Sequence, residues 1–205
     1  MRYAQILILA LLVGCDGQLK NAKSILSESK IVDIPLVTYE LQEVFFNKKS
    51  SRWQFRVNNA LVSGYIVDRF KNGQDAKQIS VYEGRKEGTL KTYFPNGQLK
   101  YEENYKNNKL HGEVKRWSQQ SGYQLMAHLN YKDGKLHGEQ KKWFVTGELH
   151  KLMHMKEGKE DGIQQAFRKN GKLYANYESK NGRVFGLKRS NLCYELDDQQ
   201  VVYKD

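Results

Sequence analysis

The chain has 205 residues, of which 39% are apolar and 28% charged, and its formal net charge at pH 7 is +11. The apolar share is too high for an intrinsically disordered chain, and two cysteines cannot supply a disulfide framework. The positive charge favours an anionic lipid, an anionic polysaccharide or an acidic protein as partner.

Residues 1–14 have the features of a bacterial export signal. Arg2 precedes an uninterrupted apolar run at residues 6–13, which is too short to span a bilayer because spanning needs about 20 apolar residues. The sequence LVGC at residues 12–15 resembles a lipobox, in which a peptidase cuts before a cysteine that carries diacylglycerol. The resemblance implies a protein anchored by lipid on Cys15 in the cell envelope, with the choice of membrane left open. The alternative is an ordinary secreted protein in which Cys15 is an incidental thiol.

The next segment and the end of the chain have weaker patterns. Residues 15–38 are expected to form the lipidated cysteine and a tether, with a possible first strand at residues 31–39. Residues 188–205 are expected to form a capping hairpin, because a repeat array must protect its ends. Within this hairpin, Cys193 is interpreted as a small buried hydrophobe.

Glycines recur at a fixed period through the central region. One set begins each repeat, at spacings of 24, 24, 26, 24 and 24 residues: Gly64, Gly88, Gly112, Gly138, Gly162 and Gly186. A second set follows the first five members by nine or ten residues: Gly73, Gly97, Gly122, Gly147 and Gly171. A period of this length predicts a solenoid or array built from one supersecondary unit.

The second set marks turns between strands. Asparagine precedes Gly73, Gly97 and Gly171, and Asn-Gly is the strongest short hairpin signal because a type I′ turn needs positive φ at both central residues. Asp133-Gly134 and Asn181-Gly182 supply a second turn in their repeats. Each repeat therefore consists of two strands and two turns.

Aromatic residues and leucines occupy fixed positions within these strands. Five residues after a leading glycine come Tyr93, Trp117, Trp143 and Phe167. A leucine follows the first turn at Leu99, Leu125, Leu149 and Leu173. Because neighbouring residues of a strand point to opposite faces, rows of side chains at these positions predict an ordered β-sheet.

The stretch GTLKTYFPNGQLKYEENYKNNKLHG at residues 88–112 resembles a variant MORN repeat. The same pattern occurs in bacterial YwqK-like proteins, which are described as antitoxin components. The resemblance covers roughly residues 64–186, with a degenerate copy from about Glu40, so that the repeats extend over residues 39–187. It implies an all-β fold, an elongated twisted antiparallel sheet of stacked β-hairpins. It says little about function, because one fold serves many tasks.

Catalytic and metal-binding motifs are lacking. His111 and His137 share a slot in successive repeats, and two strands between them predict a separation of about 10 Å, too far for one metal ion. Glu113 and Glu139 have the same expected separation, and the repeat explains both. No Ser-His-Asp arrangement, phosphate loop or Cys/His cluster is present. The sequence therefore predicts no cofactor, no metal and no enzyme activity.

One polar pattern repeats with the aromatic positions. Three lysines lie two residues before an aromatic residue and so share its strand face; the resulting strip is Lys91, Tyr93, Lys115, Trp117, Lys141 and Trp143. The functional interpretation is a surface for an extended anionic ligand or an acidic protein edge. The structural interpretation is that the rings pack on neighbouring rungs and the lysines keep the sheet soluble.

These observations predict a membrane-anchored lipoprotein whose repeat surface binds a protein or an anionic partner in the cell envelope. A nucleic-acid partner is not expected. The alternative is a YwqK-like antitoxin or immunity protein that neutralises a toxin, which rests on the resemblance alone. An envelope hydrolase comes third and has no motif to support it.

Overall fold

The computed structural model describes residues 32–120, 122–187, 194–197 and 200–203. The predicted export signal, Cys15 and Cys193 lie outside these residues. None of the described residues belongs to a helix that is long and apolar enough to cross a membrane.

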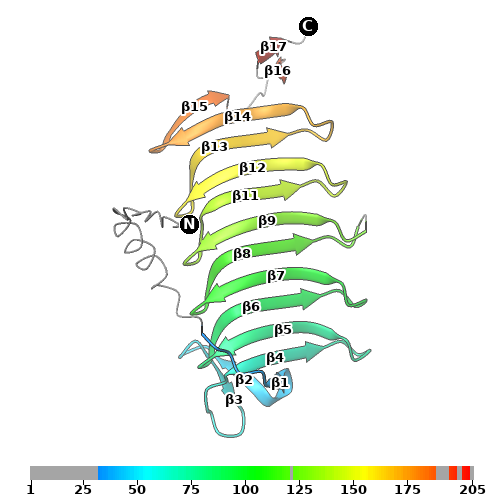
Figure 1. Ribbon diagram of the computed structural model, residues 1–205, viewed down its shortest axis with the longest axis vertical. Helices are drawn as coiled ribbons and strands as arrows, with labels where there is room; N and C mark the ends of the chain where they lie inside the picture. The colour runs from blue at the N-terminus through cyan, green and yellow to red at the C-terminus, as the bar shows by residue number, and fades with distance from the viewer. Residues whose placement is uncertain (1–31, 121, 188–193, 198–199, 204–205) are drawn as a thin grey trace, which may run out of the picture. The chain divides into compact units, whose positions relative to one another are not determined.

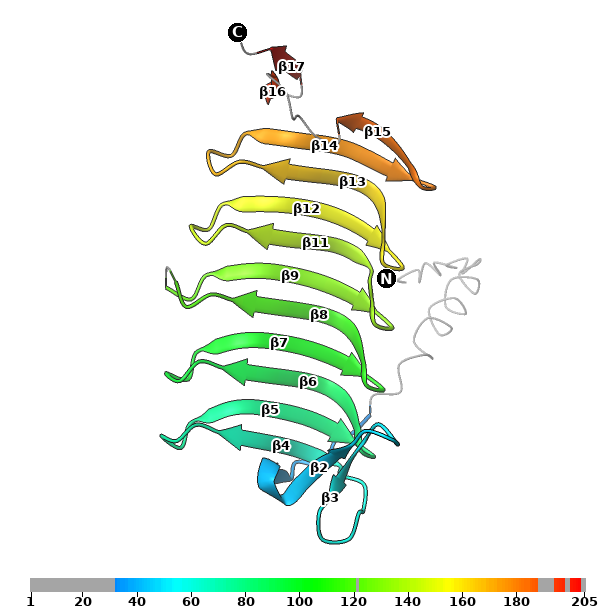
Figure 2. The same cartoon turned by 180° about the vertical axis from the view of Figure 1, so that it is seen from behind.

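The central region forms one sheet of antiparallel hairpins, stacked in chain order like rungs (Figure 1; Figure 2 shows the other side). The strands are β4 (Gly64–Arg69), β5 (Asp75–Tyr82), β6 (Arg85–Tyr93), β7 (Leu99–Lys106), β8 (Lys109–Trp117), β9 (Leu125–Lys132), β10 (Lys135–Leu136), β11 (Gly138–Trp143), β12 (Leu149–Lys156), β13 (Lys159–Phe167), β14 (Leu173–Lys180) and β15 (Arg183–Leu187). This arrangement confirms the all-β fold of stacked hairpins that the glycine period predicts.

The beginning of the described chain differs from the expected repeat. β1 (Thr38–Glu40) pairs with β4 in parallel, so the sheet is mixed rather than wholly antiparallel. A short 3₁₀ helix (Leu41–Glu43) follows, and β2 (Val44–Asn47) and β3 (Arg52–Phe55) form a separate two-stranded sheet. The degenerate copy expected from about Glu40 is therefore not a rung of the main sheet.

This segment instead covers the first rungs of the sheet. Val44 and Val62, both fully buried, form a cluster with Ile66, Ile79 and Val81 of β4 and β5, against which aromatic side chains of the segment also pack. Burial of this apolar surface protects the first rungs from solvent. At the other end of the chain, β16 (Tyr194–Asp197) and β17 (Gln200–Tyr203) form a two-stranded hairpin of their own.

The two kinds of turn have different backbone geometry from that expected. At the first turns of four repeats only the glycine has positive φ, whereas at Gly122 the following Tyr123 (φ 63°) has it too. At Gly97 (φ 83°) the N–H donates to the Phe94 carbonyl at 2.9 Å. This is a type I turn that ends in a left-handed glycine, and the expected type I′ geometry is wrong at these positions. Positive φ at both central residues occurs at the second turns, for example Asn107 (50°) and Asn108 (67°).

The leading glycines bend each hairpin. At Gly112 (φ 90°) the pairing of β7 with β8 shifts between Glu103 and Tyr105, and residues beyond the bend lie over one face of the sheet. Leu110 and Leu136 thereby pack against a buried cluster of Val114, Ala127 and Leu129. We call this the inner face and the opposite one the outer face. We call the end of each hairpin beyond this bend the arm. It consists of the second turn and the strand ends on either side of it, up to the next leading glycine.

The buried row of the inner face changes from apolar to polar along the sheet. Two residues after the leading glycine stand Ile66, Leu90 and Val114 in the first three repeats, then Gln140 and Gln164, which are 0% and 2% exposed. Gln140 Nε2 donates to the carbonyls of Asn130, His137 and Gly138, and its Oε1 accepts the N–H of Asn130. Gln140 thus satisfies backbone groups where His137 separates β10 from β11, which accounts for a buried amide at this position.

Candidate binding surfaces of the sheet

The lysines of the predicted strip occupy one row on the outer face. In the strand register Lys91 lies opposite Glu102, which lies opposite Lys115. Lys115 in turn lies opposite His128, and His128 opposite Lys141. Alternation along β8 and β11 places Trp117 and Trp143 on the same face as these lysines, and Tyr93 of β6 occupies the equivalent position.

Most of the positive charge of this row is neutralised within the sheet. Lys115 Nζ lies 2.6 Å from Glu113 Oε2, and Lys141 Nζ lies 2.6 Å from Glu139 Oε1. The hydrogen bond from Lys115 lowers the pKa of Glu113, and that from Lys141 lowers the pKa of Glu139. With Glu102 facing Lys91, the strip has three lysines and three carboxylates. The strip therefore has less net positive charge than its lysines alone indicate, because an acid stands two residues before each of two lysines.

The rings of the strip are half-buried and lie beside leucines. Trp117 lies opposite Leu125 and Trp143 opposite Leu149 across their hairpins. The strip thus combines flat apolar surface with ion pairs that are already formed. Such a surface is suited to a protein partner, because aromatic residues are enriched in the centres of protein interfaces.

Of the residues considered for chemistry, His111, Glu113 and Glu139 have side-chain partners, whereas His137 Nδ1 is buried without a hydrogen bond among the described residues. His111 Nδ1 lies 3.3 Å from Asp133 Oδ1, and His154 Nδ1 lies 3.0 Å from the Ile163 carbonyl oxygen. Glu113 also lies 3.2 Å from His128 Nε2. Among the described residues no group of three or more His, Cys, Asp or Glu side chains could hold a metal ion.

A groove of about 660 Å³ lies on β12, β13 and β14. It is lined by Lys151, Met153, Glu160, Gln164, Gln165, Ala166, Tyr174, Ala175 and Tyr177. Tyr177 donates a hydrogen bond to Glu160 at 2.8 Å; burial and this bond raise the pKa of Tyr177 to about 12. The tyrosine is therefore a neutral donor at physiological pH.

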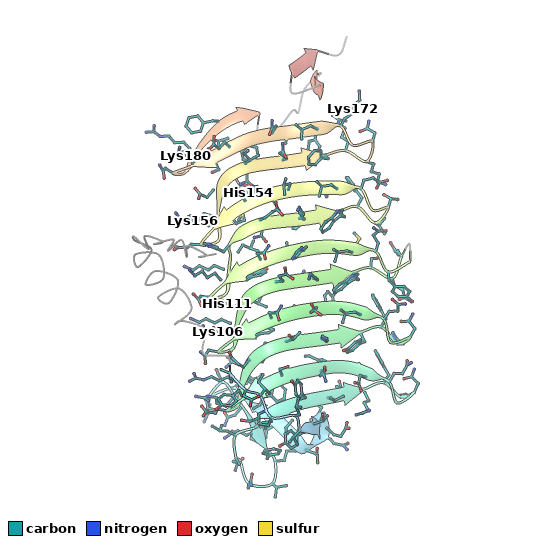
Figure 3. All side chains as sticks on the ribbon, viewed as in Figure 1. Lys106, His111, His154, Lys156, Lys172 and Lys180 are labelled. Atoms are coloured by element: carbon teal, nitrogen blue, oxygen red, sulfur yellow. The ribbon has the colours of Figure 1, made fainter. Side chains whose placement is uncertain are left out.

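A second charged row was missed in the sequence and lies on the arms. Four second turns have the related sequences KNNK, KDGK, KEGK and KNGR at residues 106–109, 132–135, 156–159 and 180–183. Each turn is flanked by two cations that lie opposite one another. Figure 3 shows Lys106, Lys156 and Lys180 along the same edge of the sheet. The signal that could have revealed this row is the spacing Lys-x-x-Lys, with arginine as the last residue in the fourth turn. In a single repeat this spacing resembles the ordinary composition of an exposed turn.

Comparison with known protein families gives a match for one hairpin of the chain. No curated protein sequence matches the chain. Residues 86–107 match the family model described as MORN repeat variant. The matched stretch runs from β6 through β7 into the second turn. One hairpin of the sheet is therefore similar to a MORN repeat variant, and the neighbouring hairpins repeat its glycine, aromatic and leucine positions.

Proposed function

We propose that this chain is a lipid-anchored binding scaffold of the bacterial cell envelope, which holds a partner protein on the outer face of its hairpin sheet. The lipobox-like residues 12–15 support the anchor. The match of residues 86–107 to a MORN repeat variant supports a repeat sheet used for binding.

The observation that carries the choice of a protein partner is the charge balance of the aromatic strip. Trp117 and Trp143 offer apolar contact, while Lys115 and Lys141 are held by Glu113 and Glu139. A polyanion would find little net charge here. A protein can bury the rings and match the fixed ion pairs with polar groups of its own, which gives specificity as well as contact area.

A charge-swap variant tests this surface without removing its ion pairs. We expect Glu113→Lys with Lys115→Glu, together with Glu139→Lys and Lys141→Glu, to weaken partner capture about ten-fold or more, because reversed charges oppose the partner's complementary groups. Net charge and the two ion pairs are preserved, and the one new like-charge contact, between the carboxylate at position 115 and Glu102, involves partly exposed groups, so Tm should fall only slightly. The measurement is quantitative affinity capture from detergent-solubilised membranes.

The matched control swaps an exposed ion pair away from the strip, Glu40→Arg with Arg69→Glu, whose atoms lie 3.1 Å apart. This variant should capture the same proteins as the unmodified chain. If the strip variant remains folded and captures them equally well, the outer face is not the binding surface.

The antitoxin alternative differs in compartment. It follows from the YwqK-like resemblance and requires the protein to meet its toxin, usually in the cytoplasm. Recovery of the mature chain in the cytoplasm, bound to a single toxic protein, would favour it over an envelope scaffold.

A further inference from the structure

The cations that flank the second turns form a continuous feature, which we call the basic ladder. Its members face one another in four cross-strand pairs: Lys106 with Lys109, Lys132 with Lys135, Lys156 with Lys159, and Lys180 with Arg183. Like charges directly opposite on neighbouring strands destabilise a sheet. Four such pairs in equivalent positions are therefore not explained by the stability of the fold.

The ladder has no charge compensation of its own. All eight side chains are exposed. Across residues 32–120 and 122–187, no carboxylate lies within 4.0 Å of any of these eight cationic groups. This differs from the outer strip, where lysines of the same face are paired. The ladder thus carries positive charge that no carboxylate of the described residues pairs with at salt-bridge distance.

Hydrogen bonds between successive arms hold the pairs at regular spacing. The backbone N–H of Asn108 donates to the Lys86 carbonyl at 2.9 Å, and that of Gly134 donates to the Leu110 carbonyl at 2.8 Å. Gly158 makes the same bond to Leu136 at 2.8 Å. Because each pair belongs to one two-strand repeat, successive pairs recur about every 10 Å. The backbone positions that carry the cations are therefore fixed before any ligand arrives, which lowers the entropy cost of binding.

The ladder is narrow, with acidic residues on both sides. At the turns themselves stand Asp133 and Glu157. Toward the sheet, the next outer-face row includes Glu113, Glu139 and Glu178. A flat anionic surface such as a membrane would contact these carboxylates together with the cations. A single thin chain lying along the ladder would meet the cations alone, so the arrangement favours a linear ligand.

We propose that the basic ladder binds a linear acidic polysaccharide that carries a carboxylate on each sugar and lies across the arms, perpendicular to the strands. The ladder crosses paired strands, so it offers regularly spaced ammonium groups but no free strand edge to which an extended peptide could add its own backbone. The preference for a polysaccharide over a nucleic acid rests on the envelope location proposed above.

The test uses the full chain in detergent and a fluorescent ten-residue oligogalacturonate. We expect binding that weakens as salt rises from 50 to 300 mM, because exposed charges are screened. Changing Lys132, Lys135, Lys156 and Lys159 to glutamine should weaken binding about ten-fold or more. The same variant should melt about 2–4 °C higher at low salt, because two repulsive pairs are removed. A merely structural role for these lysines would predict no such rise in Tm.

The control variant changes four exposed lysines elsewhere to glutamine and has the same net charge: Lys48, Lys49, Lys169 and Lys172. It should keep the affinity of the unmodified chain within about two-fold, since it leaves the ladder intact. Equal loss in both variants, or no binding by either the unmodified chain or the variants, overturns the proposal. So does binding of decaglutamate, a DNA oligonucleotide or anionic vesicles as tight as that of the oligogalacturonate. Because this assay needs no membrane partner, its failure leaves the proposed capture of a protein on the outer face standing.

Discussion

Gln140→Leu is expected to lower the free energy of unfolding by about 2–4 kcal/mol, although leucine occupies the equivalent position at Leu90. Gln140 is fully buried, and its amide joins the backbone of Asn130 to that of His137 and Gly138. Leucine would leave the Asn130 N–H without its partner where the strand is interrupted. The cost of leaving buried polar groups without partners exceeds the benefit of burying a leucine side chain there.

Gln164→Leu is the matched comparison. Gln164 occupies the same slot of the next repeat and donates to the carbonyls of His154 and Gly162, but its Oε1 accepts no hydrogen bond from the described residues. The expected loss is about 1–2 kcal/mol, smaller than that of Gln140→Leu. Chemical denaturation of both variants measures the difference. Equal losses would show that the interrupted strand at His137 is not what the amide of Gln140 supports.

Gly84→Ala is expected to destabilise the protein by more than about 3 kcal/mol. A Cβ at Gly84 would lie 2.8 Å from the Trp53 carbonyl oxygen and 3.1 Å from atoms of Arg52 and Leu61, and the backbone φ is +74°. The Gly84 carbonyl also accepts the Trp53 N–H at 2.7 Å. Because backbone atoms form the obstacle, the covering segment must move away from the first rungs.

Gly182→Ala controls for the backbone strain alone. Gly182 occupies the same turn position with φ +75°, and no atom among those described lies within 4 Å of a Cβ built there. Its expected cost is about 1 kcal/mol, the ordinary penalty of a left-handed residue. Thermal melts of the two variants should therefore differ clearly. Similar Tm values would mean that residues 34–63 do not limit the space for a side chain at the second turn of the first hairpin.

The repeat stack could be predicted because one requirement, positive φ, returns at every period. Gly88 (φ 77°), Gly112 (90°) and Gly138 (78°) all lie in this region, and few other residues tolerate it. The turn types could not be assigned from Asn-Gly alone. At Pro95-Asn96-Gly97 the fixed φ of proline suits the first central residue of a type I turn, and only the glycine takes positive φ.

The covering segment could not be predicted as such, because its aromatics imitate a repeat. Phe45 and Phe46 fall in the aromatic slots, but no glycine stands at the start of that copy. Without the bend that a leading glycine permits, β2 and β3 form a separate hairpin. Apolar side chains of the covering segment pack against Ile66 and Ile79 of the main sheet.

The charged surfaces were predicted only in part. The spacing of Lys115 and Trp117 indicates a shared face, but ion pairing depends on Glu113, which the same alternation places beside the lysine. Lys132 and Lys135 were visible in the sequence, yet their role depends on cross-strand register and on neighbouring arms, and neither follows from one repeat alone.

The anchor on Cys15 is the claim on which the envelope scaffold depends, and replacing one atom tests it. Cys15→Ser should abolish labelling by a fatty-acid analogue and move the protein from the membrane fraction to the soluble fraction, because acyl chains would be its only lipid attachment. Cleavage by the lipoprotein peptidase should also stop, leaving a longer precursor. If the serine variant is labelled and fractionates with membranes as the unmodified chain does, the protein is not a lipoprotein anchored at this residue.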